Sequence, residues 1–407
     1  MRDSRRRPRR DDRPPTGHAS AGDGATPHEL QVLVVGDGVG GLVLAGLLLN
    51  RGIRPVVVGG NAERPRPGGA VLPPVSVAML DELLLDVSVR AAGRTLRRWT
   101  LHGPDGRVRA REASAVEADR AGVMLSRSEF RRALLESLPA RVVRPETVPA
   151  RIGQSRPSVE VEFEDGVREQ FDLVVAADGR CSSVRSAASE RPAAGGERDR
   201  TEADLDSGTS PAPDDRPETV TWTVETDESV GTPTEVTEVW SGESVLTSLP
   251  LESGNVVSLS VPAAHCAGPT PTGVVESLTA TVDCLPEDAA VRLSTDATAR
   301  RDAVGGDAWR VRRVAFLGDA THAVAPLPGA ATPLAIEEAS TLADAIDRCD
   351  GPDDALATYA ARRRARVDGL RTRVPAVSPD SPTPPPNLGA AVRARAGLFA
   401  GYFDADP

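Results

Sequence analysis

Gly36, Gly38 and Gly41 stand between an apolar run at residues 30–35 and a second apolar segment at residues 41–51. The pattern predicts a buried strand followed by a helix, with the glycines in the turn between them. In such a turn the first glycine permits a sharp bend, the second lets a phosphate approach the backbone, and the third lets the helix pack on the strand. Free amides and the helix dipole then face the anion. The spacing predicts a dinucleotide site without distinguishing NAD from FAD.

The next predicted strand, at residues 54–58, lacks the acidic residue that usually follows it. A carboxylate there normally accepts hydrogen bonds from the adenosine ribose, but this chain has Gly59, and the nearest acid is Glu63. We expect weaker nucleotide binding, and Gly59→Glu is predicted to strengthen it by about 1–2 kcal/mol. Preference for NADP is an alternative, with Arg64 or Arg66 binding the additional phosphate.

Two further pairs of glycine and aspartate follow predicted buried strands. Asp178–Gly179 stands in "ADGRCSSVR", and Gly318–Asp319 stands in "LGDATHAVAPLPGAA". Between His322 and the next predicted helix, at residues 333–349, the segment consists mainly of Ala, Pro and Gly. Such a backbone could lie against a flat cofactor or form a tight turn, and the segment alone favours neither.

Together, the three motifs resemble those of the flavoprotein aromatic hydroxylases typified by para-hydroxybenzoate hydroxylase. That family has Gly-x-Gly-x-x-Gly near its start, then an Asp-Gly motif, then a Gly-Asp motif, and this chain has them in that order within residues 30–375. The resemblance implies non-covalent FAD. The positions it assigns to FAD binding are Gly36, Gly38, Val39, Gly40, Gly41, Arg127, Asp178, Gly179, Gly318, Asp319, Pro326, Gly329 and Ala330.

The resemblance also implies a role for most of these positions. The glycines of the first motif would meet the pyrophosphate, and Arg127 would open a helix against FAD. Asp178–Gly179 would lie by the pyrophosphate, where NAD(P)H approaches. Asp319 would accept hydrogen bonds from the ribityl chain, and Pro326 and Gly329 would shape the loop under the isoalloxazine ring. A helix start beyond that loop would stabilise negative charge on the reduced flavin.

The implied activity is that of an FAD-dependent monooxygenase. NAD(P)H would reduce the flavin, and one oxygen atom of dioxygen would enter a small organic substrate. The sequence shows no second glycine fingerprint, so NAD(P)H is expected to bind transiently. No side chain is assigned as a catalytic acid or base, and His322 is expected to be structural. Trp222 and Trp240 could face a substrate pocket or pack in the core.

The flavin loop departs from the family pattern, because Pro328 and Pro333 have no amide to offer. Two alternatives therefore stay open. One is a flavin-dependent reductase of isoprenoid double bonds, which shares the FAD architecture. The other is a degenerate homologue that binds FAD or a partner without turnover. A flavin halogenase is excluded, because the chain has no lysine and no Trp-x-Trp pair.

These motifs predict an α/β fold with a Rossmann-like FAD-binding domain around a parallel sheet, similar to glutathione reductase, and an antiparallel-sheet substrate domain. The FAD-binding domain is expected at residues 29–185 and 300–373, and the substrate-domain sheet at 219–299. The remaining segments are expected to be a disordered tail (1–28), an acidic loop (186–218), and a linker with a C-terminal segment (374–407).

Composition restricts the function further. The chain has 407 residues and a net charge of −11, which disfavours nucleic acid as a partner. All 48 basic residues are arginine, so chemistry that requires a lysine is excluded. Such acidic, lysine-free composition is typical of salt-loving microbes, although a GC-rich genome also favours it. The scattered cysteines suggest a cytoplasmic location and no metal site, and no apolar run is long enough to span a membrane.

Overall fold

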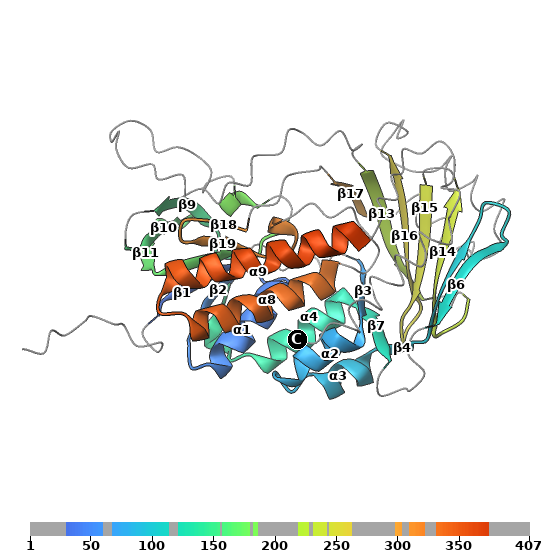
Figure 1. Ribbon diagram of the computed structural model, residues 1–407, viewed down its shortest axis with the longest axis horizontal. Coiled ribbons are helices and arrows are strands. Elements are labelled where there is room, and N and C mark those ends of the chain that lie inside the picture. The colour runs from blue at the N-terminus through green and yellow to red at the C-terminus, as the bar shows by residue number, and fades with distance from the viewer. Residues whose placement is uncertain are drawn as a thin grey trace, which may run out of the picture.

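The computed structural model describes residues 30–59, 67–113, 121–154, 157–179, 182–185, 219–227, 231–241, 244–262, 298–302, 309–321 and 331–373 (Figure 1). The expected tail, acidic loop and C-terminal segment lie outside these residues, as do His322, Pro326, Gly329 and Ala330. The fold is α/β, with parallel strands in one sheet and antiparallel strands in others, as expected. None of the described helices is long and apolar enough to cross a membrane.

A six-stranded sheet forms the centre of the molecule. Its strands run in the order β18 (Arg310–Val311), β19 (Val314–Phe316), β12 (Leu173–Ala176), β1 (Val32–Val35), β2 (Val56–Gly59) and β8 (Val143–Pro145). All neighbours are parallel except β18 and β19. Strands buried on both faces need apolar residues at every position, which explains the continuous runs in the sequence.

The two faces of this sheet pack against different partners. One face, with Val32 and Val34 of β1, packs against helices. The opposite face, with Leu33 and Val35, packs against a small antiparallel sheet. That sheet consists of β9 (Pro149–Gln154), β10 (Val159–Phe163) and β11 (Arg168–Phe171). Alternate residues along each strand therefore belong to two separate hydrophobic cores.

Helices cover the first face (Figure 1). They are α1 (Val39–Asn50), α2 (Pro74–Asp81), α3 (Asp86–Ala92), α4 (Arg127–Ser137), α8 (Ala331–Arg348) and α9 (Pro352–Arg373), with the short 3-10 helices η3 (Ala140–Val142) and η5 (Gly318–Ala320). Helix α1 is almost entirely buried, and Gly52, which follows its C-cap Arg51, has φ +78° and donates to the carbonyl of Leu49. A glycine in this conformation ends a helix at no steric cost.

A seven-stranded sheet lies beside the α/β part, at the right of Figure 1. Its order is β17 (Thr298–Asp302), β13 (Thr219–Thr226), β16 (Asn255–Pro262), β15 (Ser244–Pro250), β14 (Glu235–Ser241), β5 (Arg98–His102) and β6 (Val108–Ala113). The sequence assigned this sheet to residues 219–299, but β5 and β6 also join it. Strand β5 pairs parallel with β14, so the sheet is mixed and not wholly antiparallel.

A second small antiparallel sheet joins the two parts. It consists of β3 (Gly69–Leu72), β7 (Gly122–Ser126) and β4 (Arg94–Leu96), in that order. Val71 and Met124 of this sheet pack against Trp99, Val236 and Leu249 of the seven-stranded sheet. On its other side, Leu72 and Leu125 belong to the helical core. This small sheet therefore forms the wall between the helices and the seven-stranded sheet.

Candidate functional site

The three motifs of the sequence lie along one edge of the six-stranded sheet. Strands β1, β12 and β19 are adjacent and parallel, so their carboxyl ends point the same way. The register pairs Val35 with Ala176, and Ala176 with Phe316. The Gly36 turn, Asp178–Gly179 and Gly318–Asp319 follow these residues directly. Open α/β sheets bind their ligands at the carboxyl ends of the strands.

The turn between β1 and α1 is shaped for close backbone packing. Gly36 has φ +120°, and a Cβ atom there would lie 2.2 Å from the carbonyl oxygen of Ala177. A Cβ at Gly41 would lie 2.1 Å from the carbonyl oxygen of Gly36. Gly38, in contrast, has no atom within 4 Å of its Cβ position and serves as the N-cap of α1. The open space at Gly38 and the free amides of Val39 and Gly41 at the helix start fit a pyrophosphate.

Gly40 has a different function in the same turn. Its Cβ would meet the Leu317 side chain at 2.3 Å and the Cβ of Ala335 at 3.2 Å. Helix α1 therefore packs closely on α8 and on the segment that enters the Gly318–Asp319 turn. A residue at Gly40 larger than glycine would separate two of the motifs.

Asp178 holds the short turn that follows β12. Its Oδ2 accepts hydrogen bonds from the amide of Ser183 at 2.9 Å and from the amide of Val184 at 3.5 Å. Its Oδ1 is buried and has no hydrogen-bond partner within the described part of the chain. The adjacent Gly179 has φ +84°, with no atom within 4 Å of its Cβ position. One carboxylate oxygen is therefore structural, while the backbone at Gly179 is open to a ligand.

Gly318 and Asp319 form the start of η5. Gly318 has φ +65°, and its amide donates to Oε2 of Glu338 on α8 at 2.5 Å. Asp319 follows and is half-buried. Because Glu338 is fully buried, it fixes the turn from inside the protein. The carboxylate of Asp319 is thereby positioned on a rigid turn at the sheet edge.

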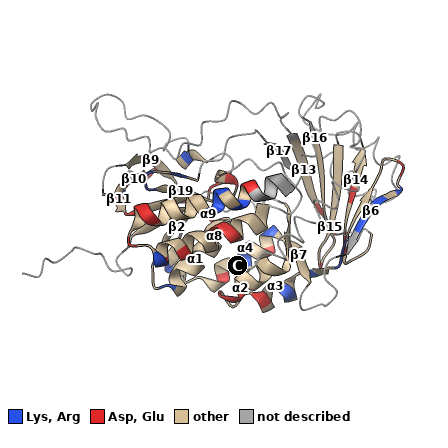
Figure 2. Cartoon of the chain, viewed as in Figure 1, with Lys and Arg blue, Asp and Glu red and all other residues tan. Residues whose placement is uncertain are grey.

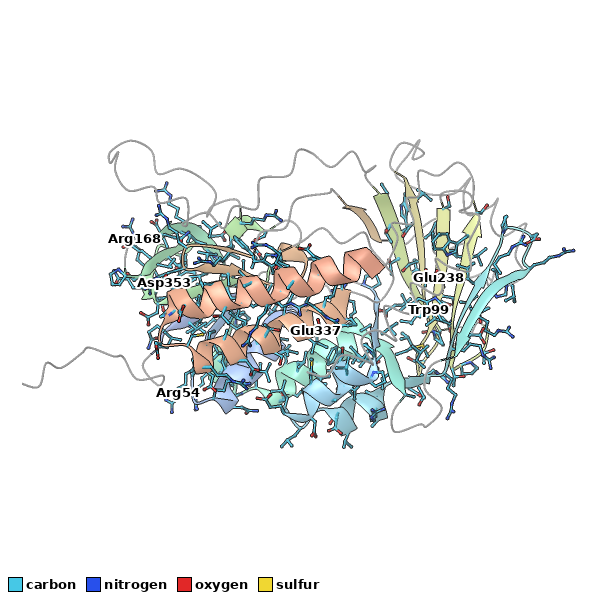
Figure 3. All side chains as sticks on the ribbon, viewed as in Figure 1. Arg54, Trp99, Arg168, Glu238, Glu337 and Asp353 are labelled. Atoms are coloured by element: carbon cyan, nitrogen blue, oxygen red, sulfur yellow. The ribbon has the colours of Figure 1, made fainter. Side chains whose placement is uncertain are left out.

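Glu338 belongs to a buried cluster of charges between α8 and α9. The guanidinium of Arg363 lies 2.8 Å from Glu337 and 3.8 Å from Glu338, and Arg366 lies 3.0 Å from Glu337. Figure 3 labels Glu337 where the two helices meet, and Figure 2 shows opposite charges there. Burial lowers the pKa of Arg363, but the two carboxylates raise it overall. This cluster was not predicted from the sequence, although two adjacent glutamates among the apolar residues of the helix predicted at 333–349 are a signal for it.

Arg127 is the first residue of α4, as expected. The hydroxyl of Ser126 caps the helix by accepting from the amide of Ser128 at 3.2 Å, a normal N-cap arrangement. The amide of Arg127 donates to the carbonyl of Gly68 at 2.9 Å. This bond ties the start of α4 to the residue before β3. The Arg127 side chain is exposed.

The end of β2 lies beside Asp37, which was not predicted from the sequence as a site residue. Gly59 is the last residue of β2, where the missing acid was expected. A Cβ atom at Gly59 would lie 2.5 Å from Cγ of Asp37, the residue between the first two fingerprint glycines. Arg131 of α4 pairs with the Asp37 carboxylate and also donates to its carbonyl at 3.0 Å. A carboxylate is therefore present beside β2, supplied by the turn between β1 and α1.

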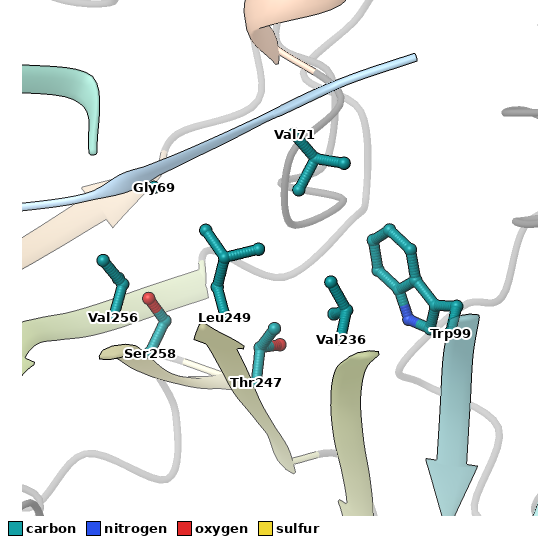
Figure 4. Close-up of a pocket in the computed structure, with 8 residues that line it drawn as sticks. All are labelled: Gly69, Val71, Trp99, Val236, Thr247, Leu249, Val256 and Ser258. Atoms are coloured by element: carbon teal, nitrogen blue, oxygen red, sulfur yellow. The ribbon is translucent and has the colours of Figure 1, made fainter. Parts of the chain in front are cut away.

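A cavity of about 70 Å³ separates β3 from the seven-stranded sheet (Figure 4). It is lined by Gly69, Val71, Trp99, Val236, Thr247, Leu249, Val256 and Ser258. In Figure 4 the side chains of the sheet point toward the strand that carries Gly69 and Val71. Trp222 and Trp240 do not line this cavity, whereas Trp99 does. The cavity is apolar with two hydroxyl groups and no charged lining residue.

A polar row crosses the sheet beside this cavity. Strand pairing places Glu238 opposite Thr247, Thr247 opposite Ser258, and Ser258 opposite Thr223. Paired residues of neighbouring strands point to the same face, so Glu238 shares the cavity face with Thr247 and Ser258. Glu238 is fully buried and accepts a hydrogen bond of 2.8 Å from Nε1 of Trp240. Figure 3 shows Glu238 and Trp99 on this sheet.

A family model described as "FAD binding domain" matches residues 29–374. The chain belongs to this FAD-binding family. The 3-amino-4-hydroxybenzoate 2-monooxygenase PtnB3 of Streptomyces platensis is 28% identical over 370 residues, covering 85% of this chain and 87% of that protein. A 3-amino-4-hydroxybenzoate 2-monooxygenase of Streptomyces cremeus is 26% identical over 363 residues, covering 85% and 86%.

Solved structures share the fold over nearly the whole length. PqsL of P. aeruginosa, in complex with 2-aminobenzoylacetate, is 26% identical with a TM-score of 0.66, covering 92% of this chain and 100% of that chain. Klebsiella pneumoniae HpxO, complexed with FAD and uric acid, is 22% identical with a TM-score of 0.67, covering 92% and 93%. FAD as cofactor and the monooxygenase class are confirmed, in preference to the reductase and the non-catalytic homologue.

Proposed function

We propose that this protein hydroxylates a small aromatic substrate that carries an amino or hydroxyl group, with NAD(P)H as reductant. In the balanced reaction, substrate, dioxygen, NAD(P)H and a proton give hydroxylated substrate, water and NAD(P)⁺. Two features of the structure together carry the proposal. The three motif turns share one edge of the six-stranded sheet, and an apolar cavity lies between β3 and the seven-stranded sheet.

The cofactor-binding roles of individual residues belong to this proposal. The open backbone at Gly38 and the amides of Val39, Gly40 and Gly41 would bind the pyrophosphate. Asp319 would accept hydrogen bonds from the ribityl hydroxyls, an interaction strengthened by the carboxylate charge. Asp178 and Gly179 would lie beside the pyrophosphate. Arg127 would contact FAD from the start of α4, and Gly318 would place Asp319.

Pro326, Gly329 and Ala330 would form the loop under the isoalloxazine ring. These residues lie outside the described part of the chain, so their role rests on the family resemblance. The helix that follows them, α8, begins at Ala331. Its N-terminal amides and dipole would favour negative charge on the reduced ring. Pro333 contributes no amide to this helix start, which leaves Ala331 and Thr332 to do so.

The residues that line the cavity support an aromatic substrate. Its volume of about 70 Å³ is smaller than the engineered cavity of roughly 150 Å³ that takes up benzene in another protein, so a ring would extend beyond it. Trp99 offers an aromatic face to such a ring. The hydroxyls of Thr247 and Ser258, with Glu238 beside them, provide acceptors for an amino or hydroxyl group. The substrate in the name of PtnB3 and the compound bound to PqsL both carry an amino group, which supports the same chemistry.

Bound FAD, reduced by NAD(P)H, supplies the activation of dioxygen and the transfer of one oxygen atom. The protein's own groups hold the substrate ring at a fixed distance and orientation, which replaces a chance encounter by a positioned one. The apolar wall of Val71, Val236 and Leu249 excludes water from the reacting centre. A nicotinamide reductant is available in the cytoplasm, which supports the cytoplasmic location expected from the sequence.

The test is turnover with isotopically labelled dioxygen. We expect the purified protein to carry FAD, and its NAD(P)H oxidation to accelerate with amino- or hydroxy-substituted benzoates and phenols. Mass spectrometry should find one labelled oxygen atom in the product. Asp319→Ala should lose flavin, and its NAD(P)H oxidation should fall in proportion. Flavin-loaded protein that oxidises NAD(P)H without labelling any aromatic compound would contradict the proposal.

A further inference from the structure

The place that an acid at the end of β2 would occupy is filled by the side chain of Asp37, from the turn between β1 and α1. In dinucleotide-binding βαβ units, a carboxylate at the end of the second strand accepts hydrogen bonds from the adenosine ribose. Here that strand ends at Gly59. A Cβ atom on Gly59 would lie 2.5 Å from Cγ, 2.7 Å from Oδ2 and 2.9 Å from Cβ of Asp37. The Asp37 side chain thus occupies the volume into which an acidic side chain at position 59 would grow.

The Asp37 carboxylate is held in this place and is not a mobile surface group. Arg131 of α4 pairs with Oδ2, and the same guanidinium donates to the Asp37 carbonyl at 3.0 Å. The side chain of Asp37 is only 19% exposed. Within the described part of the chain, the hydrogen bonds to Asp37 come from Arg131 and reach Oδ2 and the carbonyl oxygen, so Oδ1 is left to accept from a ligand.

The helix start does not account for Asp37. The N-cap of α1 is Gly38, and the first turn of α1 contains no acidic residue and no side-chain cap. A carboxylate at this point also faces the pyrophosphate region, where negative charge is unfavourable. Arg131 offsets that repulsion, because a paired guanidinium neutralises most of the local charge. An acid retained here with its own counter-ion points to a ligand that donates hydrogen bonds.

We propose that Asp37 is the acid that binds the adenosine ribose of FAD, in place of an acid on β2. The inference rests on the FAD site and not on the identity of the aromatic substrate. It also reverses the expectation from the sequence that Gly59→Glu tightens FAD binding. Because the new side chain would overlap Asp37, that substitution is now expected to weaken binding.

The first test compares FAD affinity in substituted apo-proteins by calorimetric titration. Asp37→Asn keeps the shape and removes the charge, whereas Asp37→Gly removes the whole side chain. Loss of a charge-assisted hydrogen bond should raise the Kd for FAD about ten- to hundredfold in Asp37→Gly, and less in Asp37→Asn. Glu136→Ala is the matched control, since it removes a carboxylate from an exposed pair with Arg132 on the same helix. Its Kd should stay within about twofold of the unaltered protein's.

The second test moves the acid back to β2. Gly59→Glu alone should weaken FAD binding. In a protein that already carries Asp37→Gly, adding Gly59→Glu should lower the Kd for FAD at least about tenfold, because a charged acceptor returns to the place that Asp37 vacated. Unchanged Kd in a folded Asp37→Asn protein, or the same effect of Gly59→Glu in both backgrounds, would overturn the proposal. Melting curves identify unfolded variants, and Asp37→Asn decides if Asp37→Gly fails to fold. Apo-protein that binds no FAD would instead refute the FAD site itself.

Discussion

Tyr359 shows how one buried polar residue connects α9 to the central sheet. Its side chain is fully buried, and its hydroxyl donates a hydrogen bond of 2.8 Å to the carbonyl of Phe316, the last residue of β19. Its ring meets that of Trp309 edge to face, with centroids 6.0 Å apart. Burial, and then the charge of Glu338, raise the pKa of the Tyr359 phenol well above the usual value of 10.0. The phenol therefore stays protonated next to the Gly318–Asp319 turn.

This shift predicts an alkaline limit to stability. The folded protein holds the Tyr359 proton more tightly than the unfolded chain, so the stabilisation is fully present below pH 10 and is lost as the pH rises toward the folded-state pKa. The slope should approach about 1.4 kcal/mol per pH unit. Tyr359→Phe should cost about 1 kcal/mol at pH 8, through the unpaired carbonyl, but should flatten this decline. Urea unfolding of both proteins between pH 8 and 11 measures how the free energy of unfolding changes with pH. Equal slopes in the two proteins would contradict the raised pKa of Tyr359.

The sequence predicted the elements around the cofactor well, because each has a strong local signal. Continuous apolar runs next to glycines located β1, β12 and β19, and the helix between β1 and β2 predicted the parallel pairing of that first pair. Helix α8 was likewise predicted, at residues 333–349. Strand β5 was not assigned to the seven-stranded sheet, because its pairing with β14 joins residues far apart in the chain. Local patterns cannot specify such a long-range neighbour.

The bond from Gly318 to Glu338 gives a prediction about α8 and η5. Glu338→Ala removes the acceptor for the Gly318 amide, so the turn that carries Asp319 should loosen and FAD affinity should fall. Glu338→Gln keeps an acceptor but removes a charge beside Arg363. We expect both variants to lose about 3 kcal/mol of unfolding free energy, because a buried charge loses a partner. Only Glu338→Ala should also raise the Kd for FAD, by about tenfold.

Denaturant unfolding of the apo-proteins and FAD titration separate the two effects of Glu338. The unfolding free energy reports on the charge cluster, while the Kd reports on the turn. If Glu338→Gln raised the Kd as much as Glu338→Ala, the charge and not the hydrogen bond would position Asp319.

At the scale of the whole molecule, the proposed cofactor and substrate sites belong to different sheets. The fingerprint glycines, Asp178 and Asp319 follow strands of the six-stranded sheet, whereas the cavity lies between β3 and the seven-stranded sheet. The cofactor side could be predicted from three short motifs, since backbone geometry demands glycine at fixed spacings. Nothing comparable marked the cavity. Its lining consists of ordinary apolar residues, Trp99 among them, brought together only by tertiary packing.

This separation predicts that substrate affinity and FAD affinity can be changed independently. Gly69 lies where β3 crosses the cavity, and a Cβ atom there would come 1.8 Å from Cδ2 of Leu249. In Gly69→Ala the Leu249 side chain must therefore shift into the cavity, at an overpacking cost of about 1–3 kcal/mol. The KM for the best aromatic substrate should rise about tenfold, while the Kd for FAD stays unchanged.

Gly153→Ala in β9 is the matched control for Gly69→Ala, because the nearest neighbour of a Cβ atom at Gly153, the carbonyl oxygen of Glu160, is 4.0 Å away. Steady-state kinetics and FAD titration of the variants make the comparison. In Asp319→Ala the Kd for FAD should rise while the KM for the substrate stays unchanged. An unchanged KM in Gly69→Ala would place the substrate outside this cavity, and a loss of FAD would show that the two sites share one wall.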